Sequence, residues 1–417
     1  MKPLHLDELK SAHHRIRNYI LETPLLQSFR LQKILQWEAP VFLKVETLQF
    51  TGSFKVRGAA NKILKLVEES KKPAHIVASS AGNHAQAVAY IAQALGIPAT
   101  IVMPEGAPLV KVKSTEEYGA KVVLHGAIYD QAYEKAQSLL KEIPSSVFVH
   151  PYQDLDVVAG QGTLGIEIIE QLKEKAIDPN TADVVIPVGG GGQFGGVASA
   201  FKELCPGARC FGVVADAAPA MALSFKAGKI ILGESRTRTL AEGLSIKKPS
   251  EEMLEIIKAL AVDVAIVNDA DIARAIFMLI EKLKLVAEGA GAASLAGILS
   301  GQVKADKKRP LVLSLCGGNI DLPRLSTIIE RGLHQESRWL RLEIRIEDKP
   351  GELSKVTHIL GGERANVLEV IHDRLSLDCD PGQTLLRILI ETRGAEHANQ
   401  VLAALHKESY SVRIEES

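Results

Sequence analysis

The stretch Thr51-Gly-Ser-Phe-Lys-Val-Arg-Gly58 decides how this chain is interpreted. Its lysine, Lys55, follows the apolar run 41–45, which is typical of a buried strand, and precedes a helical pattern that starts at Gly58. Open α/β sheets bind their ligands at strand-loop-helix junctions of this kind. For this segment taken alone, the alternative is that Lys55 is an ordinary solvated lysine. Two further segments, however, also place polar or glycine residues between a strand pattern and a helix pattern.

The second segment is Ser79-Ser-Ala-Gly-Asn-His-Ala-Gln86, between the apolar residues 75–78 and the helical pattern 87–92. It places hydroxyl, amide and imidazole groups beside free backbone N–H groups at a helix start. Such a start favours an anion, for example a carboxylate. The alternative is a helix whose Ser and Asn side chains only cap backbone donors.

The third segment is Gly189-Gly-Gly-Gly-Gln-Phe-Gly-Gly196, directly after the strand-like run 184–188. Its position between a strand and a helix favours a phosphate cradle over a flexible linker. The same residues match a dinucleotide fingerprint, Gly190-x-Gly192-x-x-Gly195, with Asp216 about twenty residues further on. An NAD-dependent oxidoreductase is therefore an alternative of a different class, although it leaves Lys55 and the second segment without a role.

These three segments resemble the pyridoxal-phosphate (PLP) threonine/serine dehydratases, relatives of serine racemase and tryptophan synthase β. The resemblance covers residues 5 to 335 and is greatest to the threonine dehydratase (threonine ammonia-lyase) group of medium length. Further matching segments occur in the same order: His150-Pro151, Ala159-Gly-Gln-Gly-Thr163, Ala241-Glu-Gly243, Glu288-Gly-Ala-Gly291 and Cys316-Gly-Gly-Asn-Ile-Asp321.

The resemblance implies PLP as the cofactor and a β-elimination that converts L-threonine into 2-oxobutanoate and ammonia, with L-serine dehydratase as the alternative. Lys55 would bind PLP covalently and then serve as the catalytic base. Ser80, the second catalytic residue, would bind the substrate carboxylate. The other implied cofactor residues are Phe54, Asn83, Gly189, Gly190, Gly191, Gly192, Gln193, Glu288 and Cys316, and the substrate residues are Ser80, Ala81, Gly82, Asn83 and His84.

Three positions depart from common patterns among these relatives. Cys316 would face the pyridine nitrogen, where threonine dehydratases usually have Ser; a thiol is a weak neutral donor there. Val214 stands where many relatives have a metal-binding Glu, and it offers no hard oxygen ligand, so no metal is expected. Ala81 replaces the second Ser of the racemases, which disfavours racemisation.

Composition agrees with a soluble metabolic enzyme of the cytoplasm, and the resemblance implies that its substrate is an amino acid. The 417 residues are 46% hydrophobic and carry a net charge of −1, which disfavours nucleic acid or a membrane surface as a partner. The four cysteines show neither metal-site nor disulfide spacing, as expected in a reducing compartment. The N-terminus is too polar for a signal peptide.

Alternating strand and helix patterns predict an α/β fold with parallel sheets. In the family these form a two-lobed PLP fold type II, here residues 1–335, with a smaller lobe at about 50–152. A polar connection at 333–338 then leads to a βαββαβ pattern at 338–417, which is the ferredoxin-like order. This region resembles the ACT domain. It would bind an amino-acid effector or serve only as a platform for a homodimer or homotetramer.

Overall fold

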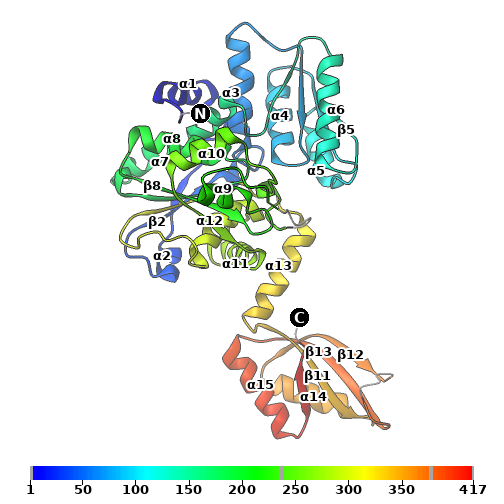
Figure 1. The fold of residues 1–417 in the computed structure, drawn as a ribbon. Helices are drawn as coiled ribbons and strands as arrows, with labels where there is room; N and C mark the ends of the chain where they lie inside the picture. The colour runs from blue at the N-terminus through cyan, green and yellow to red at the C-terminus, as the bar shows by residue number, and fades with distance from the viewer. Residues whose placement is uncertain (1–2, 234–238, 375–378, 416–417) are drawn as a thin grey trace. The chain divides into compact units, whose positions relative to one another are not determined.

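The computed structural model describes residues 3–233, 239–374 and 379–415 (Figure 1). The chain forms two compact units, Met1–Ile320 and Asp321–Ser417. Helix α13 (Leu322–Gln335) groups with the second unit, whereas the sequence placed it with the first. The polar connection expected at 333–338 is wrong in part, because α13 continues to Gln335 before β11 begins at Trp339.

A six-stranded sheet forms the centre of the first unit, in the order β1-β2-β10-β7-β8-β9. All neighbouring pairs are parallel except β1 with β2. The continuous apolar runs of β2, β7 and β10 are buried along their whole length, as expected for parallel strands covered on both faces. The strands are β1 (Leu25–Gln27), β2 (Val41–Val45), β7 (Asp183–Pro187), β8 (Arg209–Ala215), β9 (Ala261–Val267) and β10 (Leu311–Leu315).

A second, smaller sheet of four parallel strands has the order β5-β4-β3-β6. In Figure 1 its helices α4, α5 and α6 gather at one end of the first unit. The two sheets confirm the predicted two-lobed α/β fold. The elements are β3 (His75–Ser79), α4 (Asn83–Ala94), β4 (Ala99–Met103), α5 (Leu109–Glu117), β5 (Lys121–Leu124), α6 (Tyr129–Glu142) and β6 (Ser146–Phe148).

The remaining helices of the first unit pack around the larger sheet and connect the two sheets. The central ones are α3, α7, α8 and α12, which carry or border the predicted site. They are α1 (Leu6–Ile16), α2 (Phe29–Leu35), α3 (Lys55–Glu68), α7 (Leu155–Glu174), α8 (Gly192–Leu204), α9 (Ala220–Ala227), α10 (Glu251–Leu260), α11 (Asp269–Met278) with a π-helical turn (Leu279–Leu283), and α12 (Gly289–Leu299).

The second unit contains an antiparallel sheet in the order β12-β13-β11-β14, with α14 and α15 on one face. Alternate residues of β11, namely Leu340, Leu342, Ile344 and Ile346, are buried in its core. The predicted ferredoxin-like βαββαβ order is confirmed. The elements are β11 (Trp339–Glu347), α14 (Glu352–Gly362), β12 (Asn366–Asp373), β13 (Gln383–Glu391), α15 (Ala395–Lys407) and β14 (Ser411–Ile414).

Candidate active site

Most of the predicted site residues lie in loops that follow parallel strands, or at the start of the helix after such a loop, where open α/β sheets bind ligands. We call these the lysine loop (Thr51–Phe54), the asparagine loop (Ser80–Asn83), the glycine loop (Gly189–Gly192) and the C-terminal loop (Cys316–Asn319). The last three directly follow or closely follow β3, β7 and β10. Hydrogen bonds described below join the lysine, asparagine and C-terminal loops.

Lys55 is the first residue of α3, three residues earlier than the helix start expected from the sequence. Its Nζ donates to the carbonyl of Pro151 at 3.2 Å and lies 5.1 Å from the centroid of the Phe54 ring. Burial lowers the pKa of Lys55 to about 8 from its ordinary 10.5. The positive end of the helix acts in the same direction. About one tenth of this amine is therefore neutral, and so nucleophilic, at pH 7, far more than at the ordinary lysine pKa.

A buried ion network holds the start of α3. Arg57 is fully buried and donates to Glu46, at the end of β2, with both Nε and Nη2 at 2.8 Å. Its Nη2 also donates to Glu167 of α7 at 2.8 Å, and Lys44 binds the same carboxylate at 2.6 Å. The formal charges of these four side chains cancel. The network thereby fixes α3, two residues beyond Lys55, to both β2 and α7.

The asparagine loop ends at the first residue of α4, Asn83. Ser80 Oγ accepts from the backbone N–H of Gly82 at 3.2 Å, so this hydroxyl stabilises the turn. A Cβ added at Gly82 would meet no atom within 4 Å, so the loop borders open space at this residue. Free N–H groups at a helix start beside open space fit the predicted carboxylate site.

The His84 side chain is occupied by a contact with the backbone and is not placed to bind a substrate. Its Nε2 lies 2.8 Å from the carbonyl of Val149, which can only accept, so this nitrogen carries the hydrogen. Burial lowers the pKa of His84 to about 3, which keeps the ring neutral. The contact between His84 and the substrate therefore stays a prediction, and it concerns the backbone N–H of His84 and not its ring.

The glycine loop joins β7 to α8, and Gly191 has a φ of +92°. A Cβ added at Gly190 would lie 2.2 Å from the Tyr152 ring, and one at Gly189 would lie 2.6 Å from the carbonyl of Gly243. The loop is therefore glycine because other chain segments approach it closely. Gln193 is buried and donates to Ser314 Oγ at 2.9 Å, which ties the start of α8 to β10.

Cys316 and Glu288 complete the set of predicted cofactor residues. The Cys316 thiol is buried, lies 3.4 Å from the carbonyl of Ala290, and has its pKa raised well above the usual range by burial. Burial also raises the pKa of Glu288 to about 7, although a hydrogen bond from Asn83 at 2.7 Å opposes this. The backbone N–H of Phe54 donates to the carbonyl of Cys316 at 3.0 Å, which brings this thiol beside Lys55.

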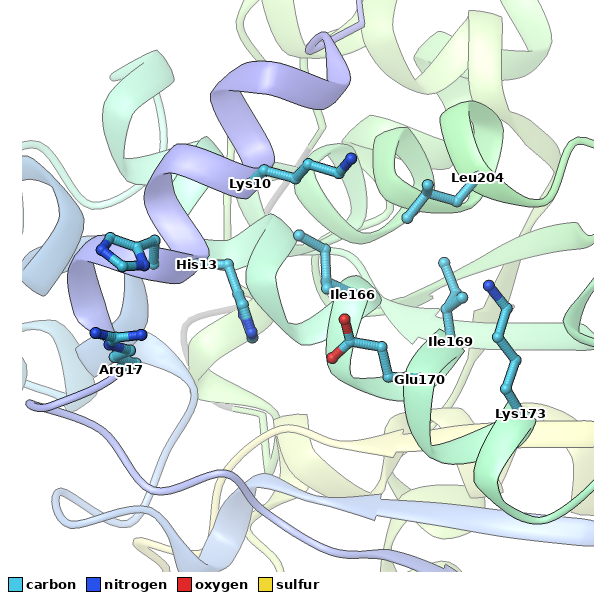
Figure 2. A pocket seen from close by; sticks show the side chains of 9 residues that line it. Lys10, His13, Arg17, Ile166, Ile169, Glu170, Lys173 and Leu204 are labelled. Carbon is cyan, nitrogen blue, oxygen red and sulfur yellow. The ribbon is translucent and has the colours of Figure 1, made fainter.

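One surface pocket lies away from this set of residues. Between α1 and α7 is a surface pocket of about 290 Å³, whose lining includes Lys10, His13, Arg17 and Lys173; none of the predicted site residues lines it (Figure 2).

Within the described ranges, no group of three His, Cys, Asp or Glu side chains is placed to hold a metal ion. In the same ranges, every helix falls short of the length and apolar character needed to cross a bilayer.

The residues present fit a PLP molecule. They offer an amine that is partly neutral, a glycine loop at a helix start for the phosphate, and a neutral thiol. Three buried hydroxyls of the flanking segments, on Thr51, Ser53 and Ser79, find no partner among the described residues, as expected around a polar ligand. The scaffold is that of the fold type II PLP enzymes. The model of the family "pyridoxal-phosphate dependent enzyme" matches residues 16–317, and this chain belongs to that family.

Relatives extend the match to almost the whole chain. An L-threonine ammonia-lyase of Thermotoga maritima is 41% identical over 409 residues, which are 98% of this chain and 99% of that protein. A solved threonine deaminase from T.th. is 37% identical with a TM-score of 0.71, covering 76% of this chain and 99% of that one. Maize serine racemase has 32% identity and the same TM-score, covering 80% and 99%. The family match confirms the predicted PLP cofactor and decides against the dehydrogenase alternative.

Sequence reasoning missed several residues that shape this site. Pro151 accepts from Lys55, and the Tyr152 ring covers Gly190. Pro151 belongs to the His150-Pro151 segment, which was noted only as a family match, and Tyr152 is the next residue. Asn319 contacts both the lysine loop and Asn83, and the only signal for it was its place in the Cys316–Asp321 segment. The roles assigned to individual site residues remain predictions.

The lowered pKa of Lys55 predicts how fast the cofactor-free protein takes up PLP at different pH. Only an unprotonated amine attacks an aldehyde, and burial disfavours the protonated form, so the rate should rise with a midpoint near pH 8. Stopped-flow absorbance at a series of pH values measures it. Lysine acetylated at its α-amino group is the reference in solution, because its ε-amine keeps the ordinary pKa. A protein midpoint that coincided with that of the reference would contradict the prediction.

Gly190→Ala is expected to weaken PLP binding at least about tenfold, because the added Cβ must displace the Tyr152 ring or the loop itself. Gly106→Ala is the matched control, since a Cβ there meets no atom within 4 Å. Titration of both cofactor-free variants with PLP, followed by absorbance, gives the two affinities. Equal affinities would mean that the loop tolerates the methyl group.

Proposed function

We propose that this chain is an L-threonine ammonia-lyase, which converts L-threonine into 2-oxobutanoate and ammonia. The observation that carries the proposal is 41% identity to an L-threonine ammonia-lyase over 98% of this chain and 99% of that protein. The partly neutral, enclosed amine of Lys55 supports it, because the reaction begins with removal of a proton from Cα.

In this proposal Lys55 would bind PLP covalently, Phe54 would cover one face of its ring, and the glycine loop with Gln193 would hold the phosphate at the N-terminus of α8. Asn83 would bind the ring hydroxyl, and Cys316 would face the ring nitrogen. The cofactor, when bound, supplies an electron sink for the carbanion at Cα. The protein then decides which bond of the substrate breaks.

The protein's own groups bind the substrate and move its proton. Backbone N–H groups of the asparagine loop and Ser80 bind the carboxylate, which fixes the Cα–H bond relative to Lys55. The Lys55 amine removes the Cα proton. Loss of the β-hydroxyl with a proton releases water, and hydrolysis of the resulting imine then gives the 2-oxo acid and ammonia. Cys316, whose thiol stays neutral because burial raises its pKa, would not protonate the ring nitrogen, and an unprotonated ring would favour elimination over amino-group transfer.

The direct test measures 2-oxo acid and ammonia formation by the purified holoenzyme from L-threonine, L-serine and D-serine. The proposal expects the highest kcat/KM with L-threonine. A higher value with L-serine would support the L-serine dehydratase alternative. Cys316 favours this alternative, because the liver-type serine dehydratases carry Cys at that position. No 2-oxo acid from either L-amino acid would overturn both.

Residues 338–417 are proposed to form an ACT-like regulatory domain in a cytoplasmic homodimer or homotetramer, with a role in isoleucine biosynthesis or threonine catabolism. The ferredoxin-like sheet with its own buried core supports the separate domain. The role of the family in isoleucine synthesis makes isoleucine the expected inhibitor and valine its antagonist. A platform that only joins subunits is the alternative.

Isoleucine is expected to raise the threonine concentration that gives half-maximal rate, and valine to reverse the rise. A coupling of about 1–3 kcal/mol between the sites corresponds to a change of about 5- to 150-fold. Steady-state kinetics of the full chain, with alanine as the control amino acid, measures it. A form without residues 338–417 should keep turnover and lose the response; an equal response in both forms would remove the regulatory role.

A further inference from the structure

The C-terminal loop holds the other site segments in place. Besides the contact from Phe54, the backbone N–H of Gly318 donates to the carbonyl of Gly52 at 2.9 Å, and that of Glu288 donates to the carbonyl of Gly317 at 3.0 Å. A Cβ added at Gly317 would lie 2.5 Å from Glu288 Oε1. The last residue of this loop, Asn319, connects through its side chain to the lysine and asparagine loops.

The donors and acceptors in this connection have only one consistent arrangement. The carbonyl of Thr51 can only accept, so the Asn319 atom 2.9 Å from it is the amide nitrogen, Nδ2. The same nitrogen lies 2.7 Å from the Asn83 side chain, which must therefore present its oxygen, Oδ1. The Asn83 nitrogen is then the atom that lies 2.7 Å from Glu288 Oε1.

The reversed orientation of Asn83 is excluded by its contact with Asn319. A flipped amide would set its nitrogen against the Asn319 nitrogen, donor against donor. It would also turn its oxygen toward Glu288, where only the protonated form of the carboxyl, whose pKa burial raises to about 7, can donate to it. Each buried polar group left without its partner costs about 1–3 kcal/mol. The hydrogen bonds of Asn319 therefore determine which way the Asn83 amide points.

Gly52 makes room for this arrangement. Its φ is +69°, and a Cβ added there would lie 2.4 Å from Asn319 Oδ1. The glycine before Ser53 thus allows the lysine loop to receive Asn319 at close range. The chain of contacts runs from the lysine loop through Asn319 and Asn83 to Glu288, so it spans three loops that are far apart in the sequence.

We propose that Asn319 is a positioning residue, which fixes the Asn83 amide with its nitrogen toward Glu288 and the PLP ring hydroxyl. The proposal rests on the proposed function for the contact between Asn83 and the ring. Glu288 uses one hydrogen of the Asn83 nitrogen, and the second is left for the ring oxygen. Asn319 itself touches neither substrate nor cofactor in this proposal.

Asn319→Asp is the sharpest test, because it keeps the shape of the side chain and replaces the donating NH2 with an oxygen. The aspartate cannot donate to Thr51 or Asn83, so the Asn83 amide loses its fixed orientation. A weaker donor to the ring oxygen disfavours its anion, so the pH midpoint of the visible PLP band should rise by about 0.5–1 unit. Lys55, Glu288 and Cys316 also face the site and are unchanged. The value of kcat/KM for L-threonine should fall about 10- to 100-fold.

Asn268→Asp is the matched control. Asn268 is exposed and caps α11 by accepting from the N–H of Asp271 at 2.8 Å, which an aspartate does equally well. This control should keep the wild-type midpoint and kinetics. Asn319→Ala, which removes the amide donor without adding charge, is measured beside it, so that the test remains decisive if the aspartate variant does not fold.

The outcomes separate this inference from the proposed function. A wild-type protein that binds PLP but forms no 2-oxo acid from L-threonine would overturn the proposed function, while the PLP-band titration still tests Asn319. If the wild type is active and both Asn319 variants match Asn268→Asp in band midpoint and in kcat/KM, the positioning role is overturned. A shift of the midpoint in both Asn319 variants, larger for the aspartate, is the expected result.

Discussion

Lys55→Ala is expected to lower the rate of threonine turnover by a factor of about 10³ or more. It should also remove the visible absorbance of bound PLP. The amine both binds the cofactor covalently and moves the Cα proton, so its removal deletes two functions at once. Because alanine has a high helix propensity, α3 should still form, and PLP should bind only through the remaining non-covalent contacts. Absorbance spectra and steady-state rates of the purified variant measure both effects.

Lys113→Ala is the matched control for this experiment. Lys113 lies on α5 in the same unit, is exposed, and is not among the residues proposed for the site. This variant should keep the PLP spectrum and the wild-type rate. A Lys55→Ala variant that still turned over threonine at more than about one hundredth of the wild-type rate would show that another group removes the proton.

Arg57→Met is expected to lower the free energy of unfolding of the first unit by about 3–5 kcal/mol. The substitution keeps a long apolar side chain but leaves the buried carboxylates of Glu46 and Glu167 with only Lys44 as a cation. Burial alone would lower the pKa of Arg57, but the two carboxylates raise it well above its usual range, so the guanidinium is charged and its loss is uncompensated. Urea unfolding of the cofactor-free protein, followed by circular dichroism, measures the change.

Arg30→Met makes the same chemical change at the surface. Arg30 is exposed and donates to the carbonyl of Lys282 at 2.8 Å, so its loss should alter the free energy of unfolding by no more than about 0.5 kcal/mol. Equal urea midpoints for the two variants would mean that the buried network relaxes around the missing cation, and that it does not hold α3.

The three strand-like runs at 41–45, 75–78 and 184–188 agree with β2, β3 and β7 to within one residue, because buried parallel strands are short, largely apolar runs. The ferredoxin-like order of the second unit was also predicted correctly, since the apolar residues of 340–346 alternate strictly. Helix limits were less accurate. The start of α3 at Lys55 depends on backbone pairing with the C-terminal loop, and such a pairing leaves no local pattern in the sequence.

The side-chain contacts within the site were harder to predict than its segments. The ring of His84 faces the carbonyl of Val149, which directly follows β6 beside β3, so the predicted contact of His84 with the substrate stays a prediction for its backbone N–H. Asn319 was not recognised as part of the site, because its contact with Thr51 joins residues 268 positions apart. Tyr152 was missed for a related reason, since only the folded chain shows what lies against Gly190.

The position of β10 has a consequence for how the protein is made. This strand is the last of the first unit in sequence, yet it lies between β2 and β7 and pairs with both. Until the ribosome has released residues 311–315, the larger sheet is divided into two parts with unpaired inner edges. Such edges are prone to aggregation. We therefore expect nascent chains that end before Leu311 to depend on chaperones, and PLP to bind only after most of the chain has been synthesised.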